Sequence, residues 1–148
     1  MSNPNFYLSI ASDATPQFIG GLLGIDVASA EPTGVRGVMK VSSQIGWIRV
    51  YYRDSQFFST DPYNEKWNFQ LRFDSSYKWN EIREVLVFKL FEWLEEEYPG
   101  IYLGSLDTGP VVFYSKNRKL IVNKNLQSHG IRLLCVPPEH ILEDLPPI

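Results

Sequence analysis

The stretch WNFQLRFDSSYKWNEIREVLVFKLFEWLEEEYPG (residues 67–100) decides the fold, because its hydrophobic periodicity changes partway along. Residues 67–73 alternate strictly between apolar and polar side chains, which is typical of a β-strand with one buried face. Residues 75–100 then carry apolar side chains at helical spacing, start at Ser75 or Ser76 as a capping residue and end at Pro99-Gly100. A strand followed by a long helix within one chain predicts an α+β domain.

The long helix is expected to be amphipathic over about residues 76–98. At 100° per residue, one half of the helical wheel is mostly apolar and is expected to pack on the sheet. This half contains Ile82, Leu86, Val87, Leu90, Phe91, Trp93, Leu94 and Tyr98. The opposite half contains Glu81, Glu84, Lys89, Glu92, Glu95 and Glu96. The helix should therefore present a row of glutamates to solvent.

The flanking segments complete a mainly antiparallel sheet. Strands are predicted within residues 5–12, 36–42, 44–54, 67–73, 101–106, 110–116, 119–125 and 130–138. A short helix is predicted over about 15–23, with Thr15 as its cap and Pro16 in its first turn, and both helices are expected to pack on one face of the sheet. Asn117 suits the left-handed position of a hairpin turn. The tail, residues 139–148, is expected to be a lid or a frayed end.

Size and charge limit the classes of function. The 148 residues fit one domain, 1–148. A net charge of −3 disfavours a general nucleic-acid or anionic-membrane binder and favours a basic partner. Cys135, the single cysteine, excludes an intramolecular disulfide and a thiolate zinc cluster, and its apolar, strand-like surroundings predict a core position. The sequence contains no signal-peptide pattern or membrane span, so a cytoplasmic location is expected.

One short motif raises the question of catalysis. Asp107-Thr108-Gly109 resembles the catalytic turn of the aspartic proteases. In those enzymes two such loops meet, because two neighbouring carboxylates must share a proton. The chain has no second Asp-Thr-Gly or Asp-Ser-Gly, so we interpret the motif as a surface turn. A small hydrolase using Asp107 remains an alternative, as does a metal-dependent enzyme using His140 and Glu143, whose spacing places them on one face of a helix.

Two other groups of residues suggest binding instead of catalysis. Neighbouring strands could bring Arg49, Arg53 and Arg72 together with Tyr51 and Gln70, which predicts a phosphate- or RNA-binding module as a second alternative. Separately, the connection SQFFSTDPYNEK (residues 55–66) is rich in aromatic residues of the types that anchor protein interfaces.

The order of the segments resembles one known family. The segments are FYLSIASDATPQFIGGLLGI at the start, WIRVYY and FQLRFD as strands, the long helix, and then LDTGPVVFYSKNRKLIVNKN. This arrangement resembles the swarm-inhibition immunity proteins of bacterial polymorphic toxin systems. In that family a short strand and helix open the chain, and a longer helix leads to hairpin strands, matched here by Asp107 to Asn123. Gly109-Pro110 stands where the family usually has a more acidic turn.

The resemblance implies a cytoplasmic inhibitor that binds and occludes a cognate protein toxin, with no catalytic residues, metal or cofactor of its own. Inhibition by occlusion needs a complementary surface with aromatic anchors and, against a basic toxin, acidic groups. We expect the partner-binding residues to be Tyr51, Phe57, Phe58, Tyr63, Glu92, Glu95 and Glu96. The activity of the toxin and the oligomeric state stay open.

Overall fold

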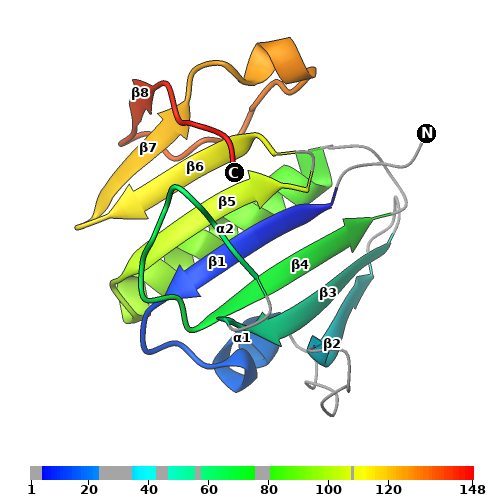
Figure 1. Cartoon of the computed structure of the whole chain (residues 1–148). Coiled ribbons are helices and arrows are strands. Elements are labelled where there is room, and N and C mark those ends of the chain that lie inside the picture. The colour runs from blue at the N-terminus through cyan, green and yellow to red at the C-terminus, as the bar shows by residue number, and fades with distance from the viewer. Residues whose placement is uncertain (1–4, 24–34, 43–46, 56–57, 76–80, 108) are drawn as a thin grey trace.

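A single mixed sheet forms the centre of the protein. The structure, a computed structural model, describes residues 5–23, 35–42, 47–55, 58–75, 81–107 and 109–148 (Figure 1). In these residues the strand order is β2-β3-β4-β1-β5-β6-β7-β8, and every pair is antiparallel except β7 with β8. The strands are β1 (Phe6–Ala11), β2 (Val35–Ser42), β3 (Trp47–Asp54), β4 (Phe69–Ser75), β5 (Ile101–Leu106), β6 (Val111–Lys116), β7 (Lys119–Asn123) and β8 (Ile141–Glu143). The predicted α+β class and mainly antiparallel sheet are confirmed.

The first strand occupies the middle of the sheet. β1 pairs with β4 on one side and with β5 on the other, so that Leu8 stands opposite both Leu71 and Gly104. Phe6, Leu8 and Ile10 are completely buried. Alternate residues of a strand point to the same face, and this face is the one that the helices cover.

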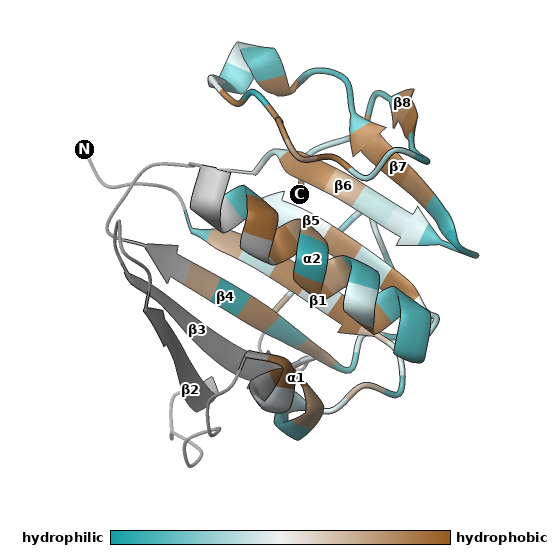
Figure 2. Ribbon diagram, turned by 180° about the vertical axis from the view of Figure 1, so that it is seen from behind, coloured by the Kyte–Doolittle hydropathy of each residue, from teal (hydrophilic) through white to brown (hydrophobic). Residues whose placement is uncertain are grey.

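Two helices lie on this face of the sheet (Figure 2). α1 spans Pro16–Leu23, and the hydroxyl of Thr15 accepts a hydrogen bond of 3.1 Å from the backbone N–H of Phe18, as expected of a helix cap. α2 spans Glu81–Glu97, so Tyr98 of the predicted helix 76–98 follows its last turn. The predicted start of the helix, with Ser75 or Ser76 as its cap, is not tested, because residues 76–80 lie outside the described residues.

The burial of α2 departs from the helical wheel most clearly at Trp93 and Glu84. Four of its residues are buried as expected: Val87, Leu90, Phe91 and Leu94. Trp93, however, is 42% exposed, whereas Glu84 is only 1% exposed. The cause is a C-terminal segment that packs beside α2: the Glu84 carboxylate accepts hydrogen bonds from the backbone N–H groups of Leu134, at 2.6 Å, and Cys135. The C-terminal segment therefore covers the side of α2 that carries Glu84, and Trp93 stays exposed.

This C-terminal segment also departs from the prediction. Residues 130–138 do not form a strand, and Cys135 is half-buried and lies outside the main core. The tail is neither a lid nor a frayed end, because β8 pairs with β7, Leu145 is buried, and the backbone N–H of Ile148 donates to the carbonyl of Gly109 at 2.9 Å.

The other face of the sheet carries a second, smaller core. Leu103 and Val111 are buried there together with Tyr63 and Leu145. Tyr63 belongs to the loop formed by residues 58–68, which crosses this face in front of the strands, while α2 lies behind them (Figure 1). The sheet is therefore covered by helices on one face and partly by a loop and the C-terminal tail on the other.

Candidate functional site

The residues expected to bind a partner fall on two different faces. Phe58 and Tyr63 belong to the loop that crosses one face of the sheet, and the glutamates belong to α2 on the other (Figures 1 and 2). Tyr51 lies in β3, and Phe57 lies outside the described residues. The structure therefore does not bring the expected residues together into one continuous surface.

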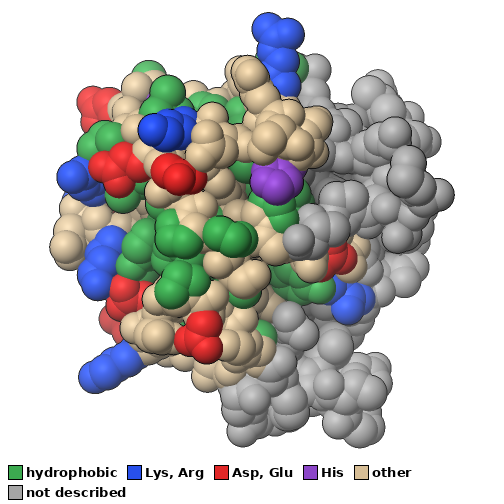
Figure 3. Space-filling model, turned by 45° about the horizontal axis from the view of Figure 1, so that its top comes forward, with side chains coloured by type: hydrophobic (Ala, Val, Ile, Leu, Met, Phe, Trp, Pro, Cys, Tyr) green, Lys and Arg blue, Asp and Glu red, His purple; other side chains and the backbone are tan. Residues whose placement is uncertain are grey.

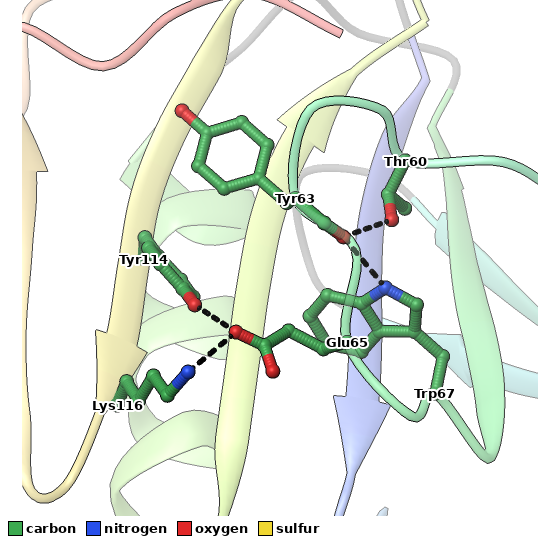
Figure 4. Close-up of polar contacts among 6 residues, drawn as sticks. All are labelled: Thr60, Tyr63, Glu65, Trp67, Tyr114 and Lys116. Carbon is green, nitrogen blue, oxygen red and sulfur yellow. Dashed lines mark hydrogen bonds and ion pairs between the residues drawn. The ribbon is translucent and has the colours of Figure 1, made fainter.

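Tyr63 holds the loop in place and is not a surface anchor. It is 8% exposed, and its hydroxyl donates to the carbonyl of Pro146 at 2.8 Å. Its own carbonyl accepts hydrogen bonds from the Thr60 hydroxyl, at 2.8 Å, and from the Trp67 indole, at 3.1 Å (Figure 4). Burial, with a smaller contribution from the charge of Asp144, raises the pKa of Tyr63 to about 12.

Glu65 fastens the same loop to β6. One of its carboxylate oxygens accepts hydrogen bonds from the Tyr114 hydroxyl, at 2.5 Å, and from the Lys116 ammonium, at 2.8 Å (Figure 4). The bond from Lys116, and then that from Tyr114, lowers the pKa of Glu65. Burial and the neighbouring carboxylate raise the pKa of Tyr114. No sequence signal pointed to this network, because its members are far apart along the chain.

The glutamates of α2 surround an exposed aromatic residue. Glu92, Glu96 and Glu97 are exposed, and among the helix residues whose side chains are described, Trp93 is the only large hydrophobic residue with substantial exposure. Beside it, an open hollow of about 530 Å³ separates α1 from α2 and is lined by Phe18, Gly21, Leu22, Trp93, Glu96 and Glu97. We call Glu92, Trp93, Glu96, Glu97 and this hollow the acidic face. Sequence reasoning missed Trp93 because the helical wheel assigned it to the buried half.

Glu95 is not part of the exposed row. Both of its carboxylate oxygens are shielded from solvent and make no hydrogen bond of normal geometry with the residues that the structure describes. Burial raises the pKa of Glu95, and the Gly100 N–H and the charge of Arg118 oppose this only in part. Its carboxylate therefore cannot contribute to a binding surface in the way the sequence suggested.

The candidate catalytic residues lie apart from one another. Asp107 is exposed in the turn after β5, where its backbone N–H donates to the carbonyl of Asn5 at 3.1 Å, as expected of a surface turn. His140 Nδ1 bonds to the carbonyl of Pro137 at 2.7 Å, and Glu143 ends β8. The expectation that His140 and Glu143 share a helical face is wrong, because residues 141–143 form a strand. Within the described ranges, no group of three or more His, Cys, Asp or Glu residues could hold a metal ion.

The strand register supports one part of the arginine alternative. In the β3–β4 ladder, Tyr51 pairs with Arg72, Arg53 with Gln70, and Arg49 with Asp74. Residues that pair directly across a ladder belong to the same face of a sheet. The register therefore aligns the arginines with Tyr51 as predicted. Gln70 belongs to the same row, but it is buried and its amide donates to the Ser9 hydroxyl at 3.0 Å, and an acidic residue, Asp74, belongs to the row as well.

Comparison with protein-family models, curated proteins and solved structures finds no match to this chain. Neither helix in the described part of the chain has the length and apolar character needed to cross a membrane. The fold and the site therefore define an α+β protein whose helical layer carries an acidic surface with an exposed tryptophan, Trp93.

Proposed function

We propose that this protein is an immunity protein that binds a basic bacterial toxin through the acidic face and blocks it by occlusion. The observation that carries the proposal is the exposure of Trp93 among Glu92, Glu96 and Glu97. The resemblance of the segment order to swarm-inhibition immunity proteins supports a toxin as the partner.

The chemistry of the acidic face suits such a partner. Tryptophan is among the residues that most often dominate binding energy, and an apolar hollow beside it can accept a partner side chain. Three carboxylates around this centre would attract a basic surface and speed its approach. A stable interface buries about 800 Å² on each partner, so α1 and α2 would both take part.

The first test is protection from a toxin. The gene next to the one that encodes this protein is expressed alone and together with it; the proposal expects growth arrest in the first case and rescue in the second.

The Trp93→Ala variant is then compared with Phe58→Ala, which truncates an aromatic residue on the opposite face of the sheet. We expect Trp93→Ala to weaken binding by about thirtyfold or more, and Phe58→Ala to leave it unchanged. Unchanged killing with the wild-type protein would overturn the proposal.

A second candidate function, phosphate or RNA binding, is favoured by the aligned register of Arg53 and Arg72 with Tyr51. It predicts salt-sensitive binding of a single-stranded oligonucleotide that Arg72→Gln weakens and Trp93→Ala leaves unchanged. Absence of such binding would contradict this second function. Metal analysis of the purified protein tests the metal-enzyme alternative. That alternative requires a stoichiometric metal ion, which the immunity-protein proposal does not.

A further inference from the structure

A pocket at the C-terminal end of the molecule is separate from the acidic face. It lies between the end of β7, the short helix η2 (Leu126–His129) and the segment that follows η2, and its volume is about 450 Å³. This volume falls in the range of small-molecule sites. Val122, Leu126 and Ile131 form its most buried part, and Leu134 and Leu142, which are 64% and 60% exposed, lie on its lining near solvent.

The walls of the pocket are held by hydrogen bonds. Glu84 on α2 binds the backbone N–H groups of Leu134 and Cys135, which fixes one wall. The N–H of Lys124 donates to the carbonyl of Glu143 at 3.0 Å, and the N–H of Ile131 donates to the carbonyl of Leu126 at 3.1 Å. The shape is therefore largely formed before any ligand arrives, which lowers the cost of binding.

The ionisable side chains that line the pocket are basic, although the Glu84 carboxylate bonds to one wall at the N–H of Leu134. Its ionisable lining residues are Lys124, Arg132 and His140, and none of the described residues that line it is acidic. Because the His140 Nδ1 donates to the Pro137 carbonyl, Nε2 is the ring nitrogen that remains for a ligand. Acidic residues occur nearby in the chain, namely Glu139, Glu143 and Asp144, but they do not line the pocket. In a protein with a net charge of −3, a purely basic lining marks a local preference for anions.

We infer that this pocket binds a small amphiphile with an apolar body and a single carboxylate head. The apolar body would lie against Val122, Leu126 and Ile131, and the carboxylate would bind Lys124 and Arg132, since a guanidinium and an ammonium are strong carboxylate donors. Figure 3, in which the top of Figure 1 is turned towards the viewer, shows hydrophobic side chains gathered among charged ones on the side of the molecule that faces the viewer.

The test compares two probes with the same eight-carbon chain, octanoate, which ends in a carboxylate, and octanol, which ends in an uncharged hydroxyl. Each is titrated into the full-length protein while backbone amide signals are followed by NMR. Octanoate should shift the signals of residues 122–136 and 140–142 and should bind at least tenfold more tightly than octanol. Equal affinity for the two probes, shifts confined to other regions, or no binding of octanoate would overturn the inference.

Variants then locate the head group. The double variant Lys124→Gln/Arg132→Gln should weaken octanoate binding about tenfold and change octanol binding little. Its matched control, Arg118→Gln/Lys119→Gln, removes the same two charges at the exposed turn between β6 and β7 and should bind octanoate like the wild type. Amide spectra and thermal midpoints of both variants establish that they are folded. Equal weakening by the two double variants would show only a general charge effect and would contradict the assignment.

Discussion

At the scale of single residues, two glutamates should affect stability in opposite directions. Glu95 is shielded without a hydrogen bond of normal geometry, and its pKa is raised by burial. Glu65 accepts bonds from Lys116 and Tyr114, and its pKa is lowered. A raised pKa means that the folded protein binds the proton more tightly than the unfolded chain, and a lowered pKa means the reverse. The two residues therefore give stability profiles of opposite slope.

Glu95→Gln should stabilise the protein at pH 7. The substitution removes a partly buried charge, and since some of the side chain still contacts solvent, the gain is small, about 1 kcal/mol. The wild-type protein recovers the same free energy as pH falls and Glu95 becomes protonated, so the difference between the two proteins should shrink towards pH 4. Urea unfolding at pH 7 and pH 4 measures this difference in unfolding free energy between the wild type and the variant. A variant that is less stable than the wild type at pH 7 would contradict this account.

Glu65→Gln should destabilise the protein at pH 7 by about 1 kcal/mol, because the bonds from Lys116 and Tyr114 lose their charged acceptor. The contribution of Glu65 is fully present above the pKa of an unfolded glutamate, about 4.3, and is lost as pH falls through the lower folded value. The difference in unfolding free energy between wild type and variant should therefore be smaller at pH 3 than at pH 7. A constant difference at both pH values would show that the carboxylate charge is not involved.

At the scale of elements, Glu84 joins α2 to the segment after η2. Glu84→Ala should destabilise the protein by about 2–3 kcal/mol, because it leaves the N–H groups of Leu134 and Cys135 without this acceptor. Glu92→Ala, on an exposed position of the same helix, is the matched control and should change stability by less than about 0.5 kcal/mol. Hydrogen exchange should quicken at residues 134 and 135 in the first variant alone. Unchanged exchange there would contradict the role of Glu84.

The elements that the sequence predicted best are those whose structure depends only on residues close together in the chain. Alternation placed β1, the cap at Thr15 placed α1, and the turn between β6 and β7 has Asn117 and Arg118 in the left-handed region at φ 56° and 60°. The apolar run at 131–136 predicted a buried strand, but only Ile131 of these residues is buried, and the N–H groups of Leu134 and Cys135 bond to the Glu84 side chain instead of to a neighbouring strand. A wheel also cannot show which part of a wide apolar surface is covered, so Trp93 was missed.

At the scale of the whole molecule, the candidate site could be predicted only in part. The glutamates of α2 and the aromatic loop were each recognisable from composition and spacing. Whether they form one surface depends on which face of the sheet each connection crosses, and hydrophobic periodicity does not determine that. The structure sends the loop over one face and α2 over the other, so only the helical half, with Trp93 added, forms the proposed binding surface.

The two faces of the sheet should nevertheless unfold together, because β5 and β6 contribute residues to both cores: Leu103 and Val111 to the smaller one, and Tyr102 and Phe113 to the main one. The ring centroid of Phe113 on β6 lies 5.1 Å from the ring centroid of Phe91 and 5.3 Å from that of Phe88, both on α2. Its distance to the ring centroid of Phe6 on β1 is 6.3 Å. The neighbouring Gly104 leaves the space that this ring fills, since an added Cβ would lie 2.5 Å from it. Loss of this packing should therefore weaken α2, β1 and β6 at once.

Phe113→Leu should lower the free energy of unfolding by about 1–2 kcal/mol without splitting the transition. Urea unfolding is followed by far-UV circular dichroism, which reports the helices and sheet, and by tryptophan fluorescence, to which Trp67 in the smaller core contributes. In the wild type the two probes should give one coincident transition, and in the variant both midpoints should fall by the same amount. Separate midpoints, or a shift seen by one probe alone, would mean that the two faces of the sheet unfold independently. The stability changes expected for Glu65, Glu84 and Glu95 would then refer to separate parts of the protein, since each face would have an unfolding equilibrium of its own.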